Sequence, residues 1–542
     1  MLSDSLPMKM RLSLSFWCVL ALGLGTSLPL QADDRIPQGP PRPNGEAPSK
    51  EAKPATAVPP VTVTEHTAII AGKPLKYKAT AGYLLLKEES EKPAGKEGEG
   101  KPGEADPSKD NLKPTAKVFF IAYTVENESA GTRPVTFAFN GGPGAASVWL
   151  HLGALGPRRV QLTAEGDGTP PPNRLVDNEY SWLNQTDLVF IDPVSTGYSR
   201  PVSGESARAF HGYNEDLQSI AEFIRSYTTQ NNRWLSPKFV VGESYGGLRA
   251  AAMAGYLQDR MDMTLNGVII VSGVLNWQTI APQPGNDLPY SLYLPSYATA
   301  AWYHKRLPVG LQQATDEQVR KEAETFASGE YLIALNRGNA LTEAQEKKVA
   351  DRLSQLTGLP VEFVLRHHLR IPPDRFMDEL LKDERLSIGR FDSRMTGISY
   401  EADGANFDPS FGLLRSTFTA AINSYLRTEL KFETDLPYHS LANVGPWNFG
   451  NAENRFLDVS DSLAHAMSKN PQLKVWVISG YYDLAVPYYG TDYALRQMLL
   501  QPAVLANLRF SKYTGGHMLY TREPELKQFT ADFNDFITKA LH

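Results

Sequence analysis

The sequence predicts an α/β fold with a mostly parallel central sheet, helices on both faces and a helical cap insertion. From residue 135 onward, short apolar runs typical of buried strands alternate with stretches whose apolar residues recur at helical spacing. Such alternation favours a parallel sheet covered on both sides. Residues 276–440 carry helix signals instead, and the strand pattern returns only near residue 473. The simplest explanation is a helical insertion into the sheet.

Six apolar runs are predicted to form the buried strands of this sheet: VTFAF (135–139), DLVFI (187–191), KFVV (238–241), GVIIVS (267–272), VWVIS (475–479) and LRFSKY (508–513). Residues 215–228 show helical spacing of apolar side chains. Upstream, strand-like segments at 76–87 and 117–126 flank a stretch rich in Gly, Pro, Lys and Glu. We therefore expect a hairpin with a long flexible loop at 88–114.

The N-terminus has the pattern of an export signal. Lys9 and Arg11 precede an apolar run, and the small residue Ala32 is followed by a polar stretch. We expect a signal peptide at 1–32; an uncleaved membrane anchor is the alternative, disfavoured by the Ser, Thr and Gly that interrupt the run. A disordered Pro-rich linker follows at 33–60. The chain has one cysteine, Cys18, which cleavage would remove. The absence of disulfides favours a bacterial periplasmic or secreted protein.

The remaining chain divides into three parts: a first part of the core at 61–275, the cap at 276–440, and a second part of the core at 441–542. The formal net charge is -6 and charged residues make up 21% of the chain. This mildly acidic balance gives no reason to expect nucleic acid or anionic membrane as a partner. We expect no membrane span after signal cleavage. The oligomeric state is not indicated.

A nucleophilic serine is predicted at Ser244. Gly242-Glu243-Ser244-Tyr245-Gly246 is a G-x-S-x-G motif, preceded by the apolar run 238–241 and followed by a helical pattern. In an α/β-hydrolase fold this motif holds the serine on a sharp strand-to-helix turn, where the two glycines permit close backbone approach. The motif alone is weak evidence, but its strand-before and helix-after context is the one that the fold requires.

His517 and Asp483 are the predicted partners of the serine. The order serine, acid, histidine is that of α/β-hydrolases. His517 follows the strand 508–513, whereas the other late histidine, His542, is the chain terminus and would fray. Asp483 follows the strand 475–479, and acids such as Asp435 lack a preceding buried strand. No second His or Cys stands at ligand spacing, so we expect no metal and no cofactor.

A glycine-rich loop is the candidate oxyanion hole. Asn140-Gly141-Gly142-Pro143-Gly144 follows the strand 135–139 directly. Such a loop can point a backbone N–H at a developing oxyanion, and we expect donors at Gly142 and at Tyr245. Phosphate binding is the alternative for any Gly-rich loop, and the absence of a following Lys-Ser/Thr pair argues against it.

Five ordered motifs resemble the serine carboxypeptidase family: NGGPGAAS (140–147), DPVSTGYS (192–199), GESYGG (242–247), GYYDLAVP (480–487) and TGGHM (514–518). The resemblance extends from about residue 65 to the C-terminus. It implies an α/β-hydrolase fold with a helical cap, a Ser-Asp-His triad and release of C-terminal residues from peptides.

The resemblance also implies that Asn140 and Glu243 bind the substrate carboxylate. A glutamate can hold a carboxylate only if one of the two groups is protonated, which favours low pH. The family's usual tryptophan two residues before the asparagine is Ala138 here, and its second glutamate corresponds to Ala154. Half of the expected carboxylate site is therefore missing. Arg158 or Arg159 could supply a compensating cation, although nothing in the sequence places either one there.

These observations predict a serine-type carboxypeptidase whose partner is a peptide with a free C-terminus. An esterase or an acyltransferase with the same triad remains the alternative, because such enzymes share these motifs. An inactive binding protein is a third possibility, disfavoured because all three triad positions hold competent residues.

Overall fold

The computed structural model describes residues 61–89, 112–126, 131–398, 408–450, 452 and 455–542. The predicted signal peptide (1–32) and linker (33–60) lie outside the described residues, as does most of the predicted loop. In the described part of the chain, no helix is both long and apolar enough to cross a bilayer.

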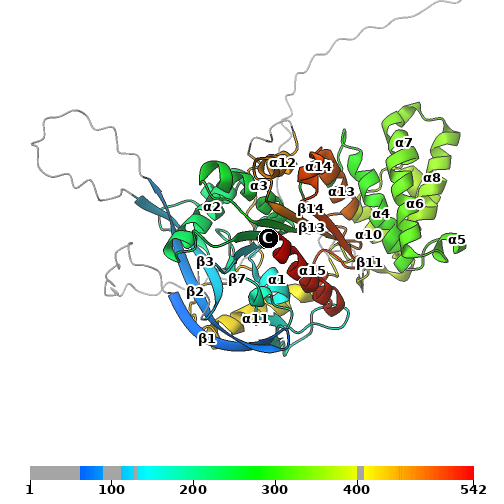
Figure 1. The fold of residues 1–542 in the computed structure, drawn as a ribbon. Helices are drawn as coiled ribbons and strands as arrows, with labels where there is room; N and C mark the ends of the chain where they lie inside the picture. Colours follow the sequence, from blue (N-terminus) through cyan, green and yellow to red (C-terminus); the bar gives the residue numbers. More distant parts are fainter. Residues whose placement is uncertain (1–60, 90–111, 127–130, 399–407, 451, 453–454) are drawn as a thin grey trace, which may run out of the picture. The chain divides into compact units, whose positions relative to one another are not determined.

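A central sheet organises the fold (Figure 1). Within the described residues it has ten strands, in the order β1-β2-β3-β7-β4-β9-β10-β13-β14, with β8 beside β3. The strands from β7 to β14 are parallel, and β1, β2, β3 and β8 pair antiparallel. Their bounds are Val61–Ile70 (β1), Lys73–Glu89 (β2), Leu112–Val125 (β3), Val135–Phe139 (β4), Asp187–Ile191 (β7), Arg200–Pro201 (β8), Lys238–Glu243 (β9), Gly267–Val271 (β10), Lys474–Gly480 (β13) and Leu508–Tyr513 (β14).

The six predicted strands are confirmed as strands, but β14, the last strand of the sheet, is mostly half-buried rather than buried. β4, β7 and β14 have the predicted bounds, and β9, β10 and β13 differ by one or two residues at their ends. Every residue of β4, β7, β9 and β10 is buried. Continuous burial on both faces explains why these segments are unbroken apolar runs rather than alternating ones.

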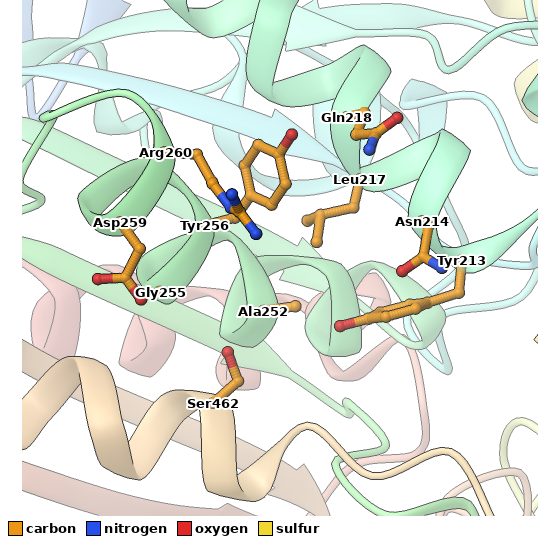
Figure 2. Close-up of a pocket in the computed structure, with 10 residues that line it drawn as sticks. All are labelled: Tyr213, Asn214, Leu217, Gln218, Ala252, Gly255, Tyr256, Asp259, Arg260 and Ser462. Carbon is orange, nitrogen blue, oxygen red and sulfur yellow. The ribbon is translucent and has the colours of Figure 1, made fainter. Parts of the chain in front are cut away.

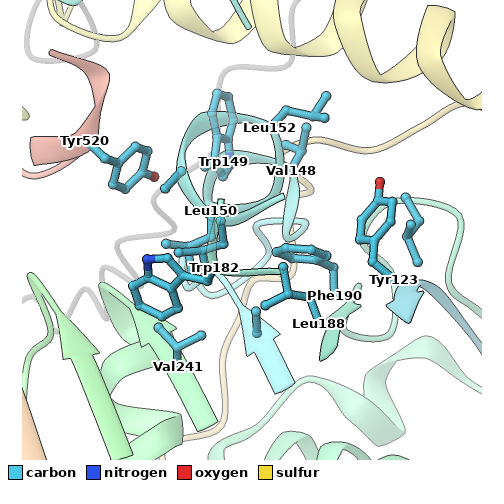
Figure 3. Packing of buried hydrophobic residues seen from close by; sticks show 14 of the residues in the cluster. Tyr123, Val148, Trp149, Leu150, Leu152, Trp182, Leu188, Phe190, Val241 and Tyr520 are labelled. Carbon is cyan, nitrogen blue, oxygen red and sulfur yellow. The ribbon is translucent and has the colours of Figure 1, made fainter. Parts of the chain in front are cut away.

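Alternate residues of each strand pack into two separate cores. Val241 and Ile269 belong to the core on one face, and their neighbours Val240 and Val268 to the core on the other. Figure 3 shows part of the first core, around Trp182. This is the two-residue period of a strand with both faces covered.

Helices cover both faces of the sheet. α1 (Val148–Leu150), α11 (Gly412–Thr428) and α15 (Glu523–Leu541) pack into the first core, and α2 (Tyr213–Gln230), α3 (Tyr245–Arg260) and α12 (Ser460–Lys469) into the second. The predicted helix at 215–228 is the interior of α2. The predicted α/β-hydrolase architecture is therefore observed.

The hairpin at the sheet edge differs from the prediction. β2 continues to Glu89 and β3 begins at Leu112, so both ends of the predicted 88–114 loop are strand. Pairing continues past the last apolar residues because exposed strand ends tolerate polar side chains. β1 was not predicted as a strand. It is an edge strand with several exposed or half-buried residues, so its hydrophobic signal is weak.

The insertion folds around a hydrophobic core of its own. Its helices are α4 (Leu288–Tyr303), α5 (Val309–Gln312), α6 (Asp316–Phe326), α7 (Leu332–Arg337), α8 (Glu343–Thr357), α9 (Val361–Arg366) and α10 (Pro373–Glu379). A short antiparallel hairpin follows, formed by β11 (Leu386–Ile388) and β12 (Thr396–Ile398). The two capping boxes that mark helix starts at Thr315 and Thr342 are both formed. The cap core also takes in residues of α13 (Tyr488–Gln497).

The cap as predicted at 276–440 extends too far. α11 packs with the sheet and α1, where Phe418 lies against Trp149 and the Tyr425 hydroxyl accepts a hydrogen bond from Tyr123. Sequence alone gives a helix at this position but not the surface against which it packs. The remaining α-helix and strands of the described residues are α14 (Pro502–Leu505) and a small hairpin of β5 (Arg158–Val160) and β6 (Leu175–Asp177).

Candidate active site

The predicted site residues gather at one edge of the sheet. β4, β9, β10, β13 and β14 are parallel neighbours, so the loops at their carboxyl ends lie side by side. These loops carry Asn140 after β4, Ser244 after β9, Asp483 after β13 and His517 after β14.

Ser244 occupies a strained turn between β9 and α3. Its φ is 62° and its ψ is −127°, which is uncommon for a residue with a side chain. Its N–H donates to the Val271 carbonyl at 3.0 Å. A Cβ on Gly242 would lie 1.9 Å from the Gly246 carbonyl oxygen, so the turn leaves no room for a side chain there. Ser244 is partly exposed while Glu243 and Tyr245 are buried.

His517 and Asp483 form a buried hydrogen-bonded pair. Nδ1 of His517 lies 2.7 Å from Oδ2 of Asp483, and the two side chains are 2% and 0% exposed. Oδ1 of Asp483 accepts the N–H groups of Ala485 at 2.7 Å and Val486 at 2.9 Å. Because the carboxylate accepts from Nδ1, the free Nε2 is left as the proton acceptor. The main chain thus holds one carboxylate oxygen while the other oxygen orients the ring.

The pKa of His517 is raised above its ordinary value, as the balance of two opposing influences. Burial lowers the pKa, but the charge of Asp483 and its hydrogen bond raise it by more. The backbone of His517 is fixed as well. Its N–H donates to the Phe391 carbonyl at 2.5 Å, and its carbonyl accepts the Ser272 hydroxyl at 2.7 Å. The Phe391 ring stacks on the imidazole with 4.9 Å between centroids.

The glycine-rich loop lies directly against the serine turn. A Cβ on Gly141 would come within 2.4 Å of the Tyr245 nitrogen and 2.7 Å of the Glu243 carbonyl oxygen. Tyr245 is the first residue of α3, so its N–H is one of those that a helix leaves without an internal partner. Gly142 is exposed and has a φ of 102°. The two predicted oxyanion donors therefore belong to segments in contact. The close packing of Gly141 against the serine turn was not predicted from the sequence, although two consecutive glycines are typical of such a contact.

Asn140 and Glu243 are brought together beside Ser244. The Asn140 Nδ2 donates to Oε1 of Glu243 at 2.9 Å, and both residues are buried. Burial raises the pKa of Glu243 to about 7; His517, Tyr520 and Asn140 act in the opposite sense, and Asp483 adds to the rise. Oε2 of Glu243 has no hydrogen-bond partner of good geometry among the described residues. The Tyr520 hydroxyl is near enough to lower the pKa of this carboxyl but makes no well-aligned hydrogen bond, so a ligand beside the nucleophile could pair with Oε2.

Tyr520 lies next to the place where the family's second glutamate is missing. Ala154 is fully buried, and a Cβ on its neighbour Gly153 would lie 2.6 Å from the Tyr520 ring (Figure 3). Burial and the charge of Glu243 raise the pKa of Tyr520 well above its ordinary value. The phenol of Tyr520, which follows His517 in the same loop, therefore lies near Glu243. The sequence analysis did not identify Tyr520.

The cations considered as replacements are engaged elsewhere. Arg158 forms ion pairs with Asp177 at 2.5 Å and Glu429 at 3.2 Å. Arg159 forms one with Glu523 at 3.4 Å. The hypothesis that either one compensates for the missing carboxylate ligands is not supported.

A surface groove of about 550 Å³ lies away from these residues. It is formed by α2, α3 and α12, and its lining includes Tyr213, Tyr256 and Arg260 (Figure 2). None of the predicted site residues lines it. Among the residues that the structure describes, no group of three or more His, Cys, Asp and Glu side chains could hold a metal ion.

Comparison with known proteins agrees with this geometry. A family model described as serine carboxypeptidase matches residues 109–348. That segment is serine carboxypeptidase-like. It includes Asn140 and Ser244 and ends before Asp483 and His517.

Curated relatives show the same likeness over part of the chain, and a solved structure shows a similar fold. The chain is 26% identical to serine carboxypeptidase-like 36 of Arabidopsis thaliana over 30% of this chain and 33% of that protein. It is 34% identical to the pheromone-processing carboxypeptidase KEX1 of Saccharomyces cerevisiae over 24% of this chain and 18% of that protein. The chain thus spans a third or less of these relatives' length. The crystal structure of KEX1(Δ)P, a prohormone-processing carboxypeptidase from Saccharomyces cerevisiae, has a TM-score of 0.52 at 17% identity, covering 85% of this chain and 91% of that one. The fold is that of an α/β-hydrolase.

Proposed function

We propose that this protein is a serine-type carboxypeptidase that hydrolyses C-terminal residues from peptides. The buried His517–Asp483 pair, at the same sheet edge as the strained Ser244, is the observation that carries this proposal. The family match supports the reaction class, and the unsatisfied Glu243 carboxyl supports the substrate class.

The chemistry follows an acyl-enzyme route. Ser244 Oγ attacks the scissile carbonyl while Nε2 of His517 takes its proton. Asp483 holds the imidazole in the tautomer whose Nε2 can accept, and it stabilises the imidazolium. The N–H groups of Gly142 and Tyr245 stabilise the oxyanion, aided by the N-terminus of α3. His517 then protonates the leaving amine, and water hydrolyses the ester by the reverse sequence.

Glu243 and Asn140 are the proposed ligands of the substrate carboxylate. When protonated, Glu243 can donate from Oε2 to a carboxylate oxygen while Asn140 holds Oε1. This form predominates below the Glu243 pKa of about 7 and is lost above it. Catalysis needs neutral His517, whose pKa is raised, so its base form increases with pH. Because of these opposite requirements, we expect the activity on a free-acid peptide to have a pH optimum and to fall at both lower and higher pH.

The deciding experiment compares matched peptides with a free and an amidated C-terminus. Product masses would be followed between about pH 4 and pH 8. We expect stepwise loss of terminal residues from the free-acid peptide only. Equal cleavage of both peptides would contradict carboxypeptidase action. Turnover of simple esters without peptide cleavage would favour the esterase or acyltransferase.

Glu243→Gln tests the carboxyl directly. Glutamine keeps an acceptor for Asn140 and stays neutral at every pH. For the wild type, we expect KM for a free-acid peptide to rise by about 10-fold from pH 6 to pH 8 as the neutral carboxyl is lost. We expect KM of the variant to be nearly constant over this range. Glu317→Gln, an exposed change on the cap, is the control. A variant that keeps the wild-type rise would exclude Glu243 as its source.

We also propose that the protein is exported, to the periplasm or the medium of a bacterium. Support comes from the basic, apolar and small-residue pattern up to Ala32. Expression of the full chain in a bacterial host should yield a mature protein that begins at about residue 33 in the periplasmic fraction or medium. Intact chain in the cytosol would contradict this. The relatives named above come from a plant and a yeast and do not test it.

A further inference from the structure

The β11–β12 hairpin places a cap segment directly on the active-site loops. The Arg390 carbonyl accepts the N–H of Leu484 in the acid loop at 3.0 Å, and the Phe391 carbonyl accepts the N–H of His517. The N–H of Ser393 donates to the Tyr482 carbonyl at 2.9 Å. The tip of the hairpin is therefore fixed to both loops by main-chain bonds. Side chains on this tip have defined positions relative to the triad.

Arg390 presents an exposed guanidinium at this tip. Its Cζ lies 5.4 Å from the centroid of the Phe391 ring, which itself stacks on His517. No ion pair joins this guanidinium to an acid among the described residues. Asp408 approaches only its main chain, where Oδ1 accepts the Arg390 N–H at 3.1 Å. The same oxygen also accepts the Ser410 hydroxyl at 2.6 Å.

Other arginines near the site are committed to internal partners. Arg394, on the same hairpin, pairs with Asp392 at 2.5 Å and donates to the Thr514 carbonyl at 2.8 Å. Arg249 is buried and pairs with Asp216 at 2.7 Å. Arg390 differs from both because its charge faces solvent beside the imidazole. Burial and the Arg390 charge both act to lower the pKa of His517, against the combined effect of Asp483 and Glu243, so the guanidinium is within electrostatic reach of the ring.

We propose that Arg390 binds the C-terminal carboxylate of the peptide from the leaving-group side of Ser244. This inference rests on the proposed carboxypeptidase function. The leaving amine must reach Nε2 of His517 to receive its proton. In a C-terminal residue, the carboxylate is separated from that nitrogen by the Cα alone, within about 4 Å. A guanidinium offers two parallel donors to a carboxylate, and stacking on Phe391 limits the entropy lost on binding.

Arg390 and Glu243 would act on the carboxylate in different ways. Glu243 contributes a neutral donor from a buried position, whereas Arg390 contributes a permanent charge at the solvent side. The cation also offers the carboxylate a partner where the tryptophan and glutamate expected at Ala138 and Ala154 are missing. A cap residue thereby adds to the preference for a free C-terminus that Asn140 and Glu243 of the core provide.

Arg390→Gln is the direct test, with Arg366→Gln as a matched control. Arg366 is also an exposed cap arginine stacked on a phenylalanine, with Cζ 5.5 Å from the Phe363 centroid, but it lies on α9 outside the site. We expect Arg390→Gln to reduce the ratio of kcat/KM for free-acid over amidated peptide by about 10-fold or more, mainly through KM. Arg390→Lys should have a ratio between those of Arg390→Gln and the wild type, and Arg366→Gln should have the wild-type ratio.

Binding measured without turnover separates this inference from the proposed function. In a Ser244→Ala background, calorimetry with a free-acid peptide should show about 10-fold weaker binding after Arg390→Gln, and no comparable change for the amidated peptide. An unchanged free-acid preference, or equal loss for both peptides, would overturn the role of Arg390 alone. A wild type without any free-acid preference would instead overturn the proposed function.

Discussion

Ser244→Ala should lower kcat/KM for peptides and esters by about 10⁴-fold or more, because no other group can form the acyl-enzyme. Stability should change little. Alanine and serine have the same backbone restrictions at a φ of 62°, and the Ser244 side chain is partly exposed. Kinetics, a thermal unfolding curve and labelling by a fluorophosphonate check this expectation.

Ser195 provides a demanding control. It also has a positive φ, 78°, and is partly exposed. Its hydroxyl lies 2.9 Å from Nε2 of His211, so it is a serine with a histidine partner outside the proposed triad. Ser195→Ala should keep full labelling and turnover. Labelled peptide mapped to Ser195 in place of Ser244 would refute the assignment of the nucleophile, and failure of the folded wild type to label would favour the inactive binding protein.

Asp483→Asn should reduce kcat by about 10³- to 10⁴-fold with the fold preserved. The asparagine oxygen can still accept the N–H groups of Ala485 and Val486. Its NH₂ group would then face Nδ1 of His517 as a donor, which moves the imidazole proton to Nε2. That nitrogen could no longer accept the proton of Ser244.

The pH profile of Asp483→Asn gives a second readout. Asp483 raises the pKa of His517, so its loss should lower this pKa and move the acid limb of the residual kcat/KM to lower pH. Asp435→Asn is the matched change at the alternative acid, which is fully exposed and lies 3.6 Å from Arg427. Wild-type rates in Asp483→Asn, or a loss of rate in Asp435→Asn, would contradict the proposed roles.

Local patterns were sufficient to predict the parallel part of the sheet and the loops that follow its strands. Strands buried on both faces are continuous apolar runs, so β4 and β7 could be located to the residue. The residues after those strands had to meet at one sheet edge, because parallel neighbours share a direction. The hydrogen bond between His517 and Asp483 agrees with that expectation.

Features that depend on distant contacts escaped the sequence analysis. α11 has an ordinary amphipathic pattern, and nothing in it distinguishes packing on the sheet from packing in the cap. Arg158 and Arg159 looked available because their acidic partners come from other segments. Arg390 stands close to the proposed triad only because a hairpin turns back on it. No spacing in the sequence records such returns.

The hydrogen bond between the β11–β12 hairpin and His517 limits how far the core and the insertion could be exchanged between proteins. The carbonyl that holds the histidine's main chain comes from Phe391 in the insertion, while the residues of the proposed triad all come from the core. Core and insertion are therefore not exchangeable modules. A chimera with a foreign insertion would keep serine, aspartate and histidine in sequence but lose the anchor that sets the histidine's position.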